Sequence, residues 1–366
     1  MAQYHADKAA GFPNVDRNAY HPDHPNGSRV VDFNISNGLI TGCNVCDQAT
    51  NTSRCQGCKV VSYCGREHQT IDWSAHKSFC SKIKKMRARL EEQETALRVH
   101  QGDEDTPPNA FEKDGEDYGM FWMYMGLRPY MKTRQALVDA LVQVNTKDAI
   151  EAAFAHCVEM MRLNTADNQG MGNMLPALLL RQGKDQQCYN TLRWHHVGQS
   201  EAGEPKNEDA LEPVLDFLRP RVPLAHLVAL ALVKVRLLID MRGIHLRHQA
   251  TSSYEPQRYV SGITARHHER FAHASAEISD MLKLQVMNMY VGVWFSNELF
   301  WPALLSPDED LRIRPNMGWK GSKQEMQISL QQTYNAWVES PGAIEVMREM
   351  ADDVDLREQL RRVPRG

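Results

Sequence analysis

Six of the eight cysteines in this 366-residue chain lie between positions 43 and 80, interleaved with two histidines. They follow the spacing C-x2-C-x8-C-x2-C-x5-C-x3-H-x7-H-x3-C. A disulfide framework would need an oxidising compartment, and the N-terminal sequence MAQYHADKAAGFPN has no apolar core of the kind that a signal peptide needs. Clustered cysteine and histidine in an intracellular chain instead predicts metal binding, and this constrains the fold more than any other feature.

Four pairs of side chains supply the candidate metal ligands. The two Cys-x2-Cys pairs place their thiolates on tight turns, the second of which contains Gly57. The other two pairs are spaced i,i+4, so each lies on one face of a helix. Four such pairs make two tetrahedral sites, which suits two Zn²⁺ ions. The candidate ligands are Cys43, Cys46, Cys55, Cys58, Cys64, His68, His76 and Cys80.

Spacing alone does not establish which pairs share an ion. In the interleaved arrangement, one ion is held by Cys43, Cys46, Cys64 and His68, and the other by Cys55, Cys58, His76 and Cys80. Each site then has three thiolates and one imidazole. With all four positions filled by protein, no position remains for water or substrate, which predicts structural zinc.

The ligand order and its neighbours resemble a MYND-type zinc finger. Tyr63 precedes Cys64, Gln69 follows His68, and Trp73 lies three residues before His76. Position 68 departs from the family, which usually has cysteine there. The resemblance implies a module that binds short proline-containing peptides, often of the P-x-L-x-P kind, with Gln69 and Trp73 in the peptide groove. An indole face suits an extended proline segment, although Trp73 can instead pack beneath the short helix.

The rest of the chain predicts a mainly α fold in which the finger is followed by a large helical domain. Helical periodicity continues beyond the finger, and an acidic stretch at 103–117 with two adjacent prolines marks a boundary. The predicted segments are a disordered or extended N-terminal arm at 1–38, the finger at 39–80, a helix and acidic linker at 81–117, an α-helical scaffold at 118–350 and a C-terminal tail at 351–366.

Within the scaffold, two helix–turn–helix units repeat at a spacing close to that of a tetratricopeptide array. Lys147-Asp148 and Lys184-Asp185 each open a second helix, 37 residues apart. A tetratricopeptide-like array and an irregular bundle both fit this pattern. Ser322 and Glu325 form a capping box for a later helix, and Pro341 is expected to begin the next one. Segments of 118–350 are also similar to fungal MYND-finger proteins with a C-terminal helical domain of undefined role.

Charge and hydropathy restrict the classes of partner. A net charge of −4 argues against nucleic acid, and the basic stripe from Lys82 to Arg89 is followed at once by three glutamates, as in a solvated helix face. The longest apolar run, Val222 to Val233, is too short to cross a bilayer, so no membrane association is predicted. The sequence carries no prediction of oligomeric state.

Motifs of the enzymes that carry such fingers are missing from the sequence. It has no glycine-rich phosphate loop, Gly-x-Ser-x-Gly elbow, His-Glu-x-x-His or methyltransferase cofactor segment. The sequence therefore predicts a non-enzymatic adaptor in the cytoplasm or nucleus, whose finger captures a proline-containing segment of a partner protein. The alternatives are an accessory or regulatory subunit of a chromatin- or ubiquitin-linked enzyme, and a methyltransferase.

Overall fold

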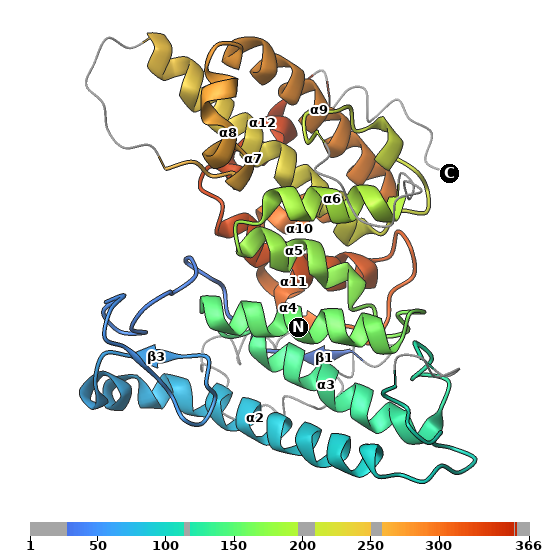
Figure 1. The fold of residues 1–366 in the computed structure, drawn as a ribbon. Helices are drawn as coiled ribbons and strands as arrows, with labels where there is room; N and C mark the ends of the chain where they lie inside the picture. Colours follow the sequence, from blue (N-terminus) through green and yellow to red (C-terminus); the bar gives the residue numbers. More distant parts are fainter. Residues whose placement is uncertain (1–27, 113–117, 197–208, 250–257, 355, 357–366) are drawn as a thin grey trace, which may run out of the picture.

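The computed structural model describes residues 28–112, 118–196, 209–249, 258–354 and 356. The predictions for residues 1–27, for 113–117 of the acidic stretch and for most of the C-terminal tail lie outside the described residues. Helices dominate, which confirms the predicted mainly α class (Figure 1). The helices are α2 (Arg66–Arg98), α3 (Arg128–Leu141), α4 (Lys147–Leu163), α5 (Leu175–Arg181), α6 (Asp185–His196), α7 (Leu224–Gln249), α8 (Gly262–Ala272), α9 (Ser275–Ser296), α10 (Phe300–Leu305), α11 (Lys323–Val338) and α12 (Ala343–Asp352).

Short elements complete the described part of the chain. The 3-10 helices are η1 (Met125–Leu127), η2 (Gly172–Met174), η3 (Leu215–Phe217) and η4 (Asp308–Leu311). The strands are β1 (Arg29–Val30), β2 (Ser53–Arg54), β3 (Ser62–Tyr63) and β4 (Ile313–Arg314). Strand β2 pairs antiparallel with β3 inside the finger, whereas β1 pairs antiparallel with β4, nearly 300 residues away.

The first helices stack in chain order from α2 to α6 (Figure 1). Helices α3 and α4 form one antiparallel pair, and α5 and α6 form the next, as the two helix–turn–helix units predict. Thr146 caps α4, because its Oγ1 accepts a hydrogen bond from the backbone N–H of Ala149 at 3.3 Å. The start of α4 at Lys147 and of α6 at Asp185 agrees with the sequence pattern.

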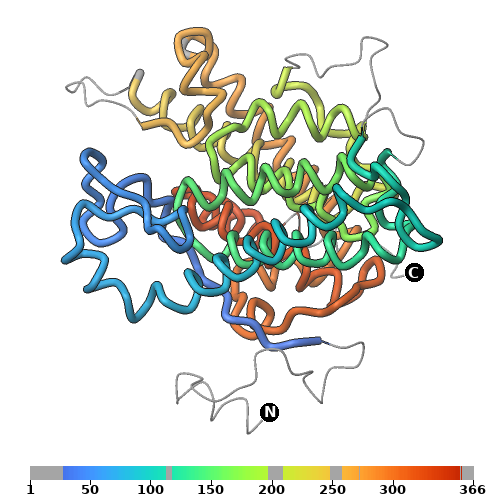
Figure 2. The backbone as a smooth tube through the Cα atoms, turned by 60° about the horizontal axis from the view of Figure 1, so that its bottom comes forward, coloured from blue at the N-terminus to red at the C-terminus, as the bar shows by residue number. Residues whose placement is uncertain are grey.

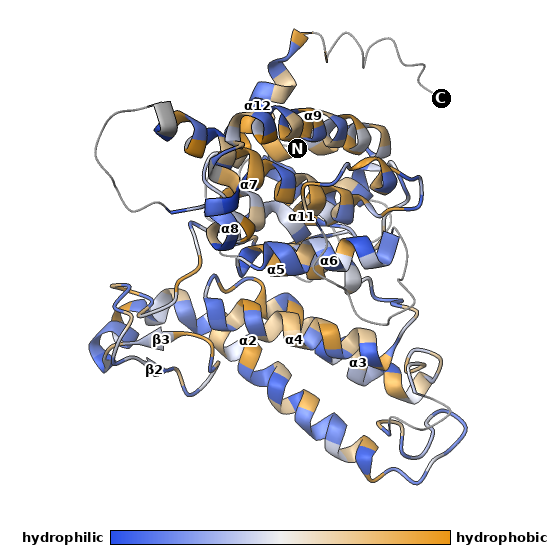
Figure 3. Ribbon diagram, turned by 45° about the horizontal axis from the view of Figure 1, so that its top comes forward, coloured by the Kyte–Doolittle hydropathy of each residue, from blue (hydrophilic) through white to orange (hydrophobic). Residues whose placement is uncertain are grey.

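Long-range packing makes the scaffold a bundle, not a row of repeats. Helix α11 packs against both α5 and α7, and α7 pairs along its length with α9. In a solenoid each repeat contacts only its neighbours along the sequence, so the insertion of α11 breaks that rule. Buried apolar residues of α7, α9 and α11 belong to one core cluster, and Figure 3 shows hydrophobic residues along these helices.

Two apolar clusters form the core. The larger one occupies the scaffold from α5 to the C-terminal helices. The second joins the finger to the first scaffold helices: Val61 and Ile83 belong to the same cluster as Leu127 and Leu137. The finger therefore shares a hydrophobic core with α2, α3 and α4, and burial of this shared surface holds the two parts together.

Residues 28–38 form a strap that crosses from the scaffold to the finger (Figure 2). After β1, the backbone N–H of Ser36 donates to Asn335 Oδ1 of α11 at 3.0 Å. Asn34 donates two hydrogen bonds to Gln143, just after the end of α3, from its backbone N–H to Oε1 and from Nδ2 to the carbonyl oxygen. Ile40 then forms a parallel bridge with Thr146, directly before the first zinc-ligand pair.

One predicted helix start differs in the structure. Ser322 caps α11 as expected, with its Oγ accepting from the Glu325 N–H at 3.1 Å. The next helix begins at Ala343 instead of Pro341, because Gly342 adopts a left-handed φ of 82°. A residue in that conformation interrupts a right-handed helix, so α12 can only begin after it.

None of the helices in the described ranges combines the length and apolar character needed to cross a membrane. The long helix α7 instead carries buried charges that link the scaffold internally. Arg236 lies 3.3 Å from both carboxylate oxygens of Asp185 on α6, and both side chains are almost completely buried. Arg236 also donates to Leu180 O and Ser340 Oγ.

Replacing Asp185 by alanine is expected to destabilise the scaffold by about 3–5 kcal/mol, because Arg236 is left as an uncompensated buried charge. Asp216→Ala is the matched control: Asp216 pairs with Arg219 at the surface, where removal costs at most about 1 kcal/mol. Urea unfolding followed by far-UV circular dichroism measures both. Equal losses in the two variants would contradict a stabilising role for the buried pair.

Candidate metal centres

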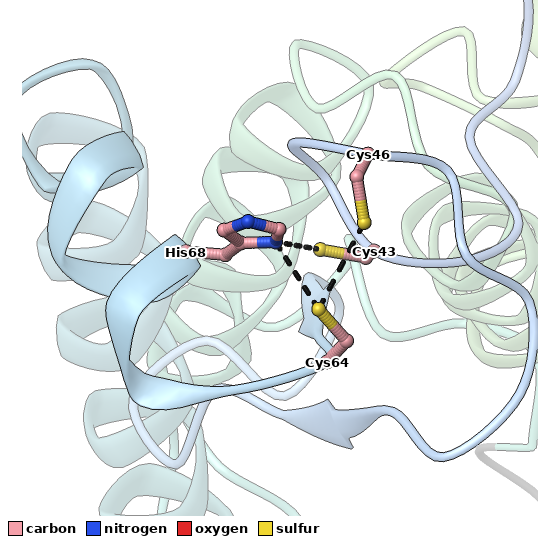
Figure 4. A group of neighbouring side chains, drawn as sticks. All are labelled: Cys43, Cys46, Cys64 and His68. Carbon is pink, nitrogen blue, oxygen red and sulfur yellow. Dashed lines mark hydrogen bonds between the residues drawn. The ribbon is translucent and has the colours of Figure 1, made fainter.

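The first centre lies between the N-terminal turn of the finger and the start of α2. Cys43, Cys46, Cys64 and His68 point toward one another (Figure 4). His68 Nδ1 lies 3.4 Å from the sulfur of Cys43 and 3.1 Å from that of Cys64, and the sulfurs of Cys46 and Cys64 are 3.8 Å apart. The structure thus brings together the four residues of the interleaved arrangement.

The second centre is completely buried and contains Cys55, Cys58, His76 and Cys80. Nε2 of His76 lies 3.4 Å from the sulfur of Cys55 and 3.6 Å from that of Cys58. The sulfurs of Cys55 and Cys80 are 3.7 Å apart. Burial lowers the pKa of His76, which favours the neutral imidazole that a metal ligand requires.

The separations fit zinc. In a tetrahedral site, Zn–S bonds of about 2.3 Å and Zn–N bonds of about 2.0–2.1 Å place the ligand atoms roughly 3.5–3.8 Å apart. The distances above lie close to this range, and within each group all ligand atoms are within 4.8 Å of one another. The two clusters therefore fit two zinc sites of three thiolates and one imidazole each.

Both Cys-x2-Cys turns have the same backbone geometry. The N–H of the residue after the second cysteine bonds to the carbonyl of the first: Asp47 to Cys43 at 2.9 Å and Lys59 to Cys55 at 2.8 Å. Asp47 and Lys59 adopt left-handed φ values of 54° and 59°. Gly57 is required in the second turn, because a Cβ there would lie 2.6 Å from the sulfur of Cys80.

The thiols of each centre depend on a cation to ionise together. Burial opposes ionisation of Cys43, but backbone N–H groups outweigh it and lower the pKa of this thiol to about 6. Burial and the sulfurs of Cys43 and Cys46 raise the pKa of Cys64 to about 11. Burial and Cys55 likewise raise the pKa of Cys80 to about 12. A dication within each cluster supplies the charge that holds three thiolates close together.

Helix α2 carries three of the eight ligands, because Cys64 lies two residues before the helix begins at Arg66; only the pair His76 and Cys80 lies within a helix as predicted. Cys64 and His68 enclose its first turn, and His76 and Cys80 follow two turns later. The helix then continues to Arg98, and its apolar stripe, which includes Ile83 and Leu90, packs into the shared core. The zinc centres therefore anchor one end of a helix whose other end is held by the scaffold.

Asp72 and Arg87 support the centres in ways that the sequence pattern did not reveal. Asp72 accepts hydrogen bonds from Tyr63 Oη at 2.6 Å and Asn44 Nδ2 at 2.9 Å, which ties the first turn to α2. Arg87 donates to the carbonyl oxygen of Cys58. The sequence predicts that the basic stripe from Lys82 to Arg89 is a solvated helix face. Arg87 belongs to this stripe, but it is half-buried and faces the finger.

Gln69 and Trp73, the residues predicted to bind peptide, line a groove of about 640 Å³ beside both centres. The indole of Trp73 is 43% exposed, so it does not lie in the core beneath the helix. Gln69 donates from Nε2 to the sulfur of Cys55 at 3.7 Å. The groove is open to solvent along α2, between two rigid metal centres.

A family model described as MYND finger matches residues 43–80, the segment that holds all eight ligands. Residues 43–80 form a MYND finger. MYND fingers are protein-interaction modules, so this segment is built for contact with another protein. His68 occupies a position at which the family usually has cysteine. Its ring nitrogen lies within 4.8 Å of the other three ligand atoms of the first centre, as a zinc ligand requires.

One curated protein is similar to this chain over the finger. Rho GTPase-activating protein gacZ of Dictyostelium discoideum is 44% identical over 52 residues, which are 14% of this chain. The match spans only 5% of the length of that relative. No solved structure matches the chain. The similarity of 118–350 to fungal proteins stays a prediction.

Metal analysis is expected to find two zinc ions per chain, and Cys64→Ser should lower the content to about one, because only the first centre loses a thiolate. Cys157→Ala is the control, since Cys157 is a buried cysteine of α4 outside both centres. EDTA should unfold the finger while most far-UV helicity remains. A zinc content of two in Cys64→Ser would contradict the ligand assignment.

Proposed function

We propose that the chain is an adaptor whose MYND finger captures a proline-containing segment of a partner protein. The observation that carries this proposal is the open groove that contains Gln69 and Trp73, the two positions at which the family resemblance places peptide binding. A half-exposed tryptophan offers a large apolar face, and its side chain loses little conformational entropy on binding. Both properties are typical of interface hot spots.

The two groove residues offer complementary chemistry for an extended peptide. The ring of Trp73 is held against His76, with ring centroids 6.1 Å apart, so the indole is oriented before a ligand arrives. The side-chain N–H of Gln69 is directed at Cys55, and its amide oxygen can accept a hydrogen bond from a peptide N–H. A proline segment in the polyproline II conformation loses little entropy on docking.

The groove charges favour a peptide with acidic residues beside its proline. Arg54, Arg66 and Lys84 line the groove, and its described lining contains no carboxylate. Arg54 is already paired with Asp148 of α4 at 2.6 Å, which leaves Arg66 and Lys84 to meet the ligand. Exposed charges of this kind affect the association rate and specificity more than affinity.

We also propose that the chain acts without chemistry of its own and works inside the cell. Every position of both zinc centres is taken by a protein side chain, which suits structural zinc. Six zinc-ligand thiolates need a reducing compartment to persist. The surface of the scaffold would then hold a second partner while the finger holds the first.

Trp73→Ala is expected to weaken binding of a proline-containing peptide about 30-fold, the loss that corresponds to an interface hot spot worth ~2 kcal/mol. Ile71→Ala is the matched control, because Ile71 is an exposed apolar residue of the same helix outside the groove. Fluorescence anisotropy with labelled peptides measures both variants, and zinc content confirms the fold. Unchanged affinity in Trp73→Ala would contradict the proposal.

A further inference from the structure

A second cavity, of about 400 Å³, lies where α2, α3 and α4 meet, on the scaffold side of the finger. Arg87 and Arg98 reach it from α2, Arg134 from α3 and His156 from α4. Leu90 and Leu137 supply an apolar part of the wall. Its volume is within the range of small-molecule sites, and its polar groups converge from three helices.

Arg134 is the central cation of this cavity. Its side chain is more than nine-tenths buried. It donates to Tyr130 Oη and to His156 Nδ1, the latter at 3.1 Å. Its Nε is a buried nitrogen for which the described residues provide no hydrogen-bond partner. This Nε has almost no accessible surface, so an anion in the cavity would be stabilised by the buried positive charge of the guanidinium and not by a bond to Nε.

His156 presents a second donor to the same cavity. A guanidinium can only donate hydrogen bonds, so Nδ1 of His156 must be the acceptor and Nε2 carries the proton. Burial and the charges of Arg134 and Arg87 lower the pKa of His156 to about 4, so the ring is neutral at physiological pH. A neutral imidazole adds a donor without repelling the two arginines.

The acids that line the cavity do not cancel its positive charge. Glu94 is engaged by Arg98 at 2.6 Å and by Tyr130 Oη at 3.1 Å, and it lies 3.6 Å from Arg134. Arg98 also stacks over Phe111. Three arginines and two glutamates line the cavity, so its side chains keep a net charge of +1 although Glu94 pairs with both Arg98 and Arg134.

We propose that this cavity binds a phosphate group, as inorganic phosphate or as the phosphomonoester of a small organic molecule. The donors come from three helices that line one cavity, which suits a tetrahedral oxyanion with several acceptor oxygens. A carboxylate offers two oxygens in one plane and suits a single guanidinium fork. The two leucines provide a contact for an organic part of the ligand.

A ligand in this position would join the finger to the scaffold. Arg87 lines the cavity and also donates to the carbonyl oxygen of Cys58, a zinc ligand of the second centre. Arg134 and His156 belong to the scaffold helices. A phosphate between them adds contacts across this junction and stabilises the folded chain by mass action.

The test uses the full zinc-loaded chain in phosphate-free buffer, with inorganic phosphate, phenyl phosphate and acetate added at matched ionic strength. Saturable rises in melting temperature, and saturable line broadening in ³¹P NMR, are expected for one or both phosphates and not for acetate. Inorganic phosphate binding more tightly indicates the free anion, whereas phenyl phosphate binding more tightly indicates an organic ester. No saturable binding, or an equal response to acetate, would overturn the proposal.

Two variants test whether phosphate binds in this cavity. Arg87→Gln should weaken phosphate binding about tenfold, because it removes a charge-assisted donor. Arg89→Gln is the matched control, an exposed arginine of the same helix that does not line the cavity. Arg134→Lys keeps the charge but replaces the planar guanidinium fork by a single ammonium group, and should weaken binding similarly while the zinc content stays at two. Equal affinity of Arg87→Gln and Arg89→Gln would show that phosphate binds elsewhere.

Discussion

Zinc coordination through two i,i+4 pairs is the constraint from which the N-terminal half of this structure follows. The pairs Cys64/His68 and His76/Cys80 hold the first turns of α2 against two Cys-x2-Cys turns, so the position and direction of a 33-residue helix are set by two ions. The far part of α2 then packs on α3 with its apolar stripe. Structural zinc contributes folding free energy directly, and here that energy also orients the scaffold contacts.

The finger and scaffold meet through a few polar contacts around the start of α4. Thr146 caps this helix and donates from Oγ1 to the carbonyl oxygen of Val60 at 2.6 Å. Arg54 of the finger pairs with Asp148 in the first turn of the same helix. The N-terminus of α4 is thus capped by Thr146, and Thr146 and Asp148 both link it to the finger. The groove that contains Gln69 and Trp73 is consequently held in a defined orientation relative to the scaffold, as the proposed adaptor role would require.

The features that could be predicted from the sequence are those that depend on residues close together in the chain. The eight ligands, the continuous helix after the finger and the starts of α4, α6 and α11 all follow from spacing, capping or periodicity within a few residues. The partition of ligands between two ions was left open by spacing, because it depends on how the two turns fold back on α2. The structure resolves it by distance.

What the sequence did not reveal depends on contacts between distant segments. Arg87 lies in a basic stripe that resembles a solvated face, and only the approach of α4 and the second zinc turn makes it half-buried. The unpaired Nε of Arg134 has no signature in a helical pattern. Strands of two residues carry too little periodicity to be recognised, so the pairing of β1 with β4 could not be predicted.

That pairing has a consequence for how the chain is made. The finger leaves the ribosome before the scaffold that follows it, and its eight ligands are all present once residue 80 has emerged. The strap beside it waits for partners that are synthesised nearly 300 residues later, in β4 and at Asn335. At about 5–20 residues per second, this is a delay of roughly 15–60 seconds. Zinc loading can therefore precede completion of the scaffold, and docking of the strap becomes a later step that requires β4 and α11.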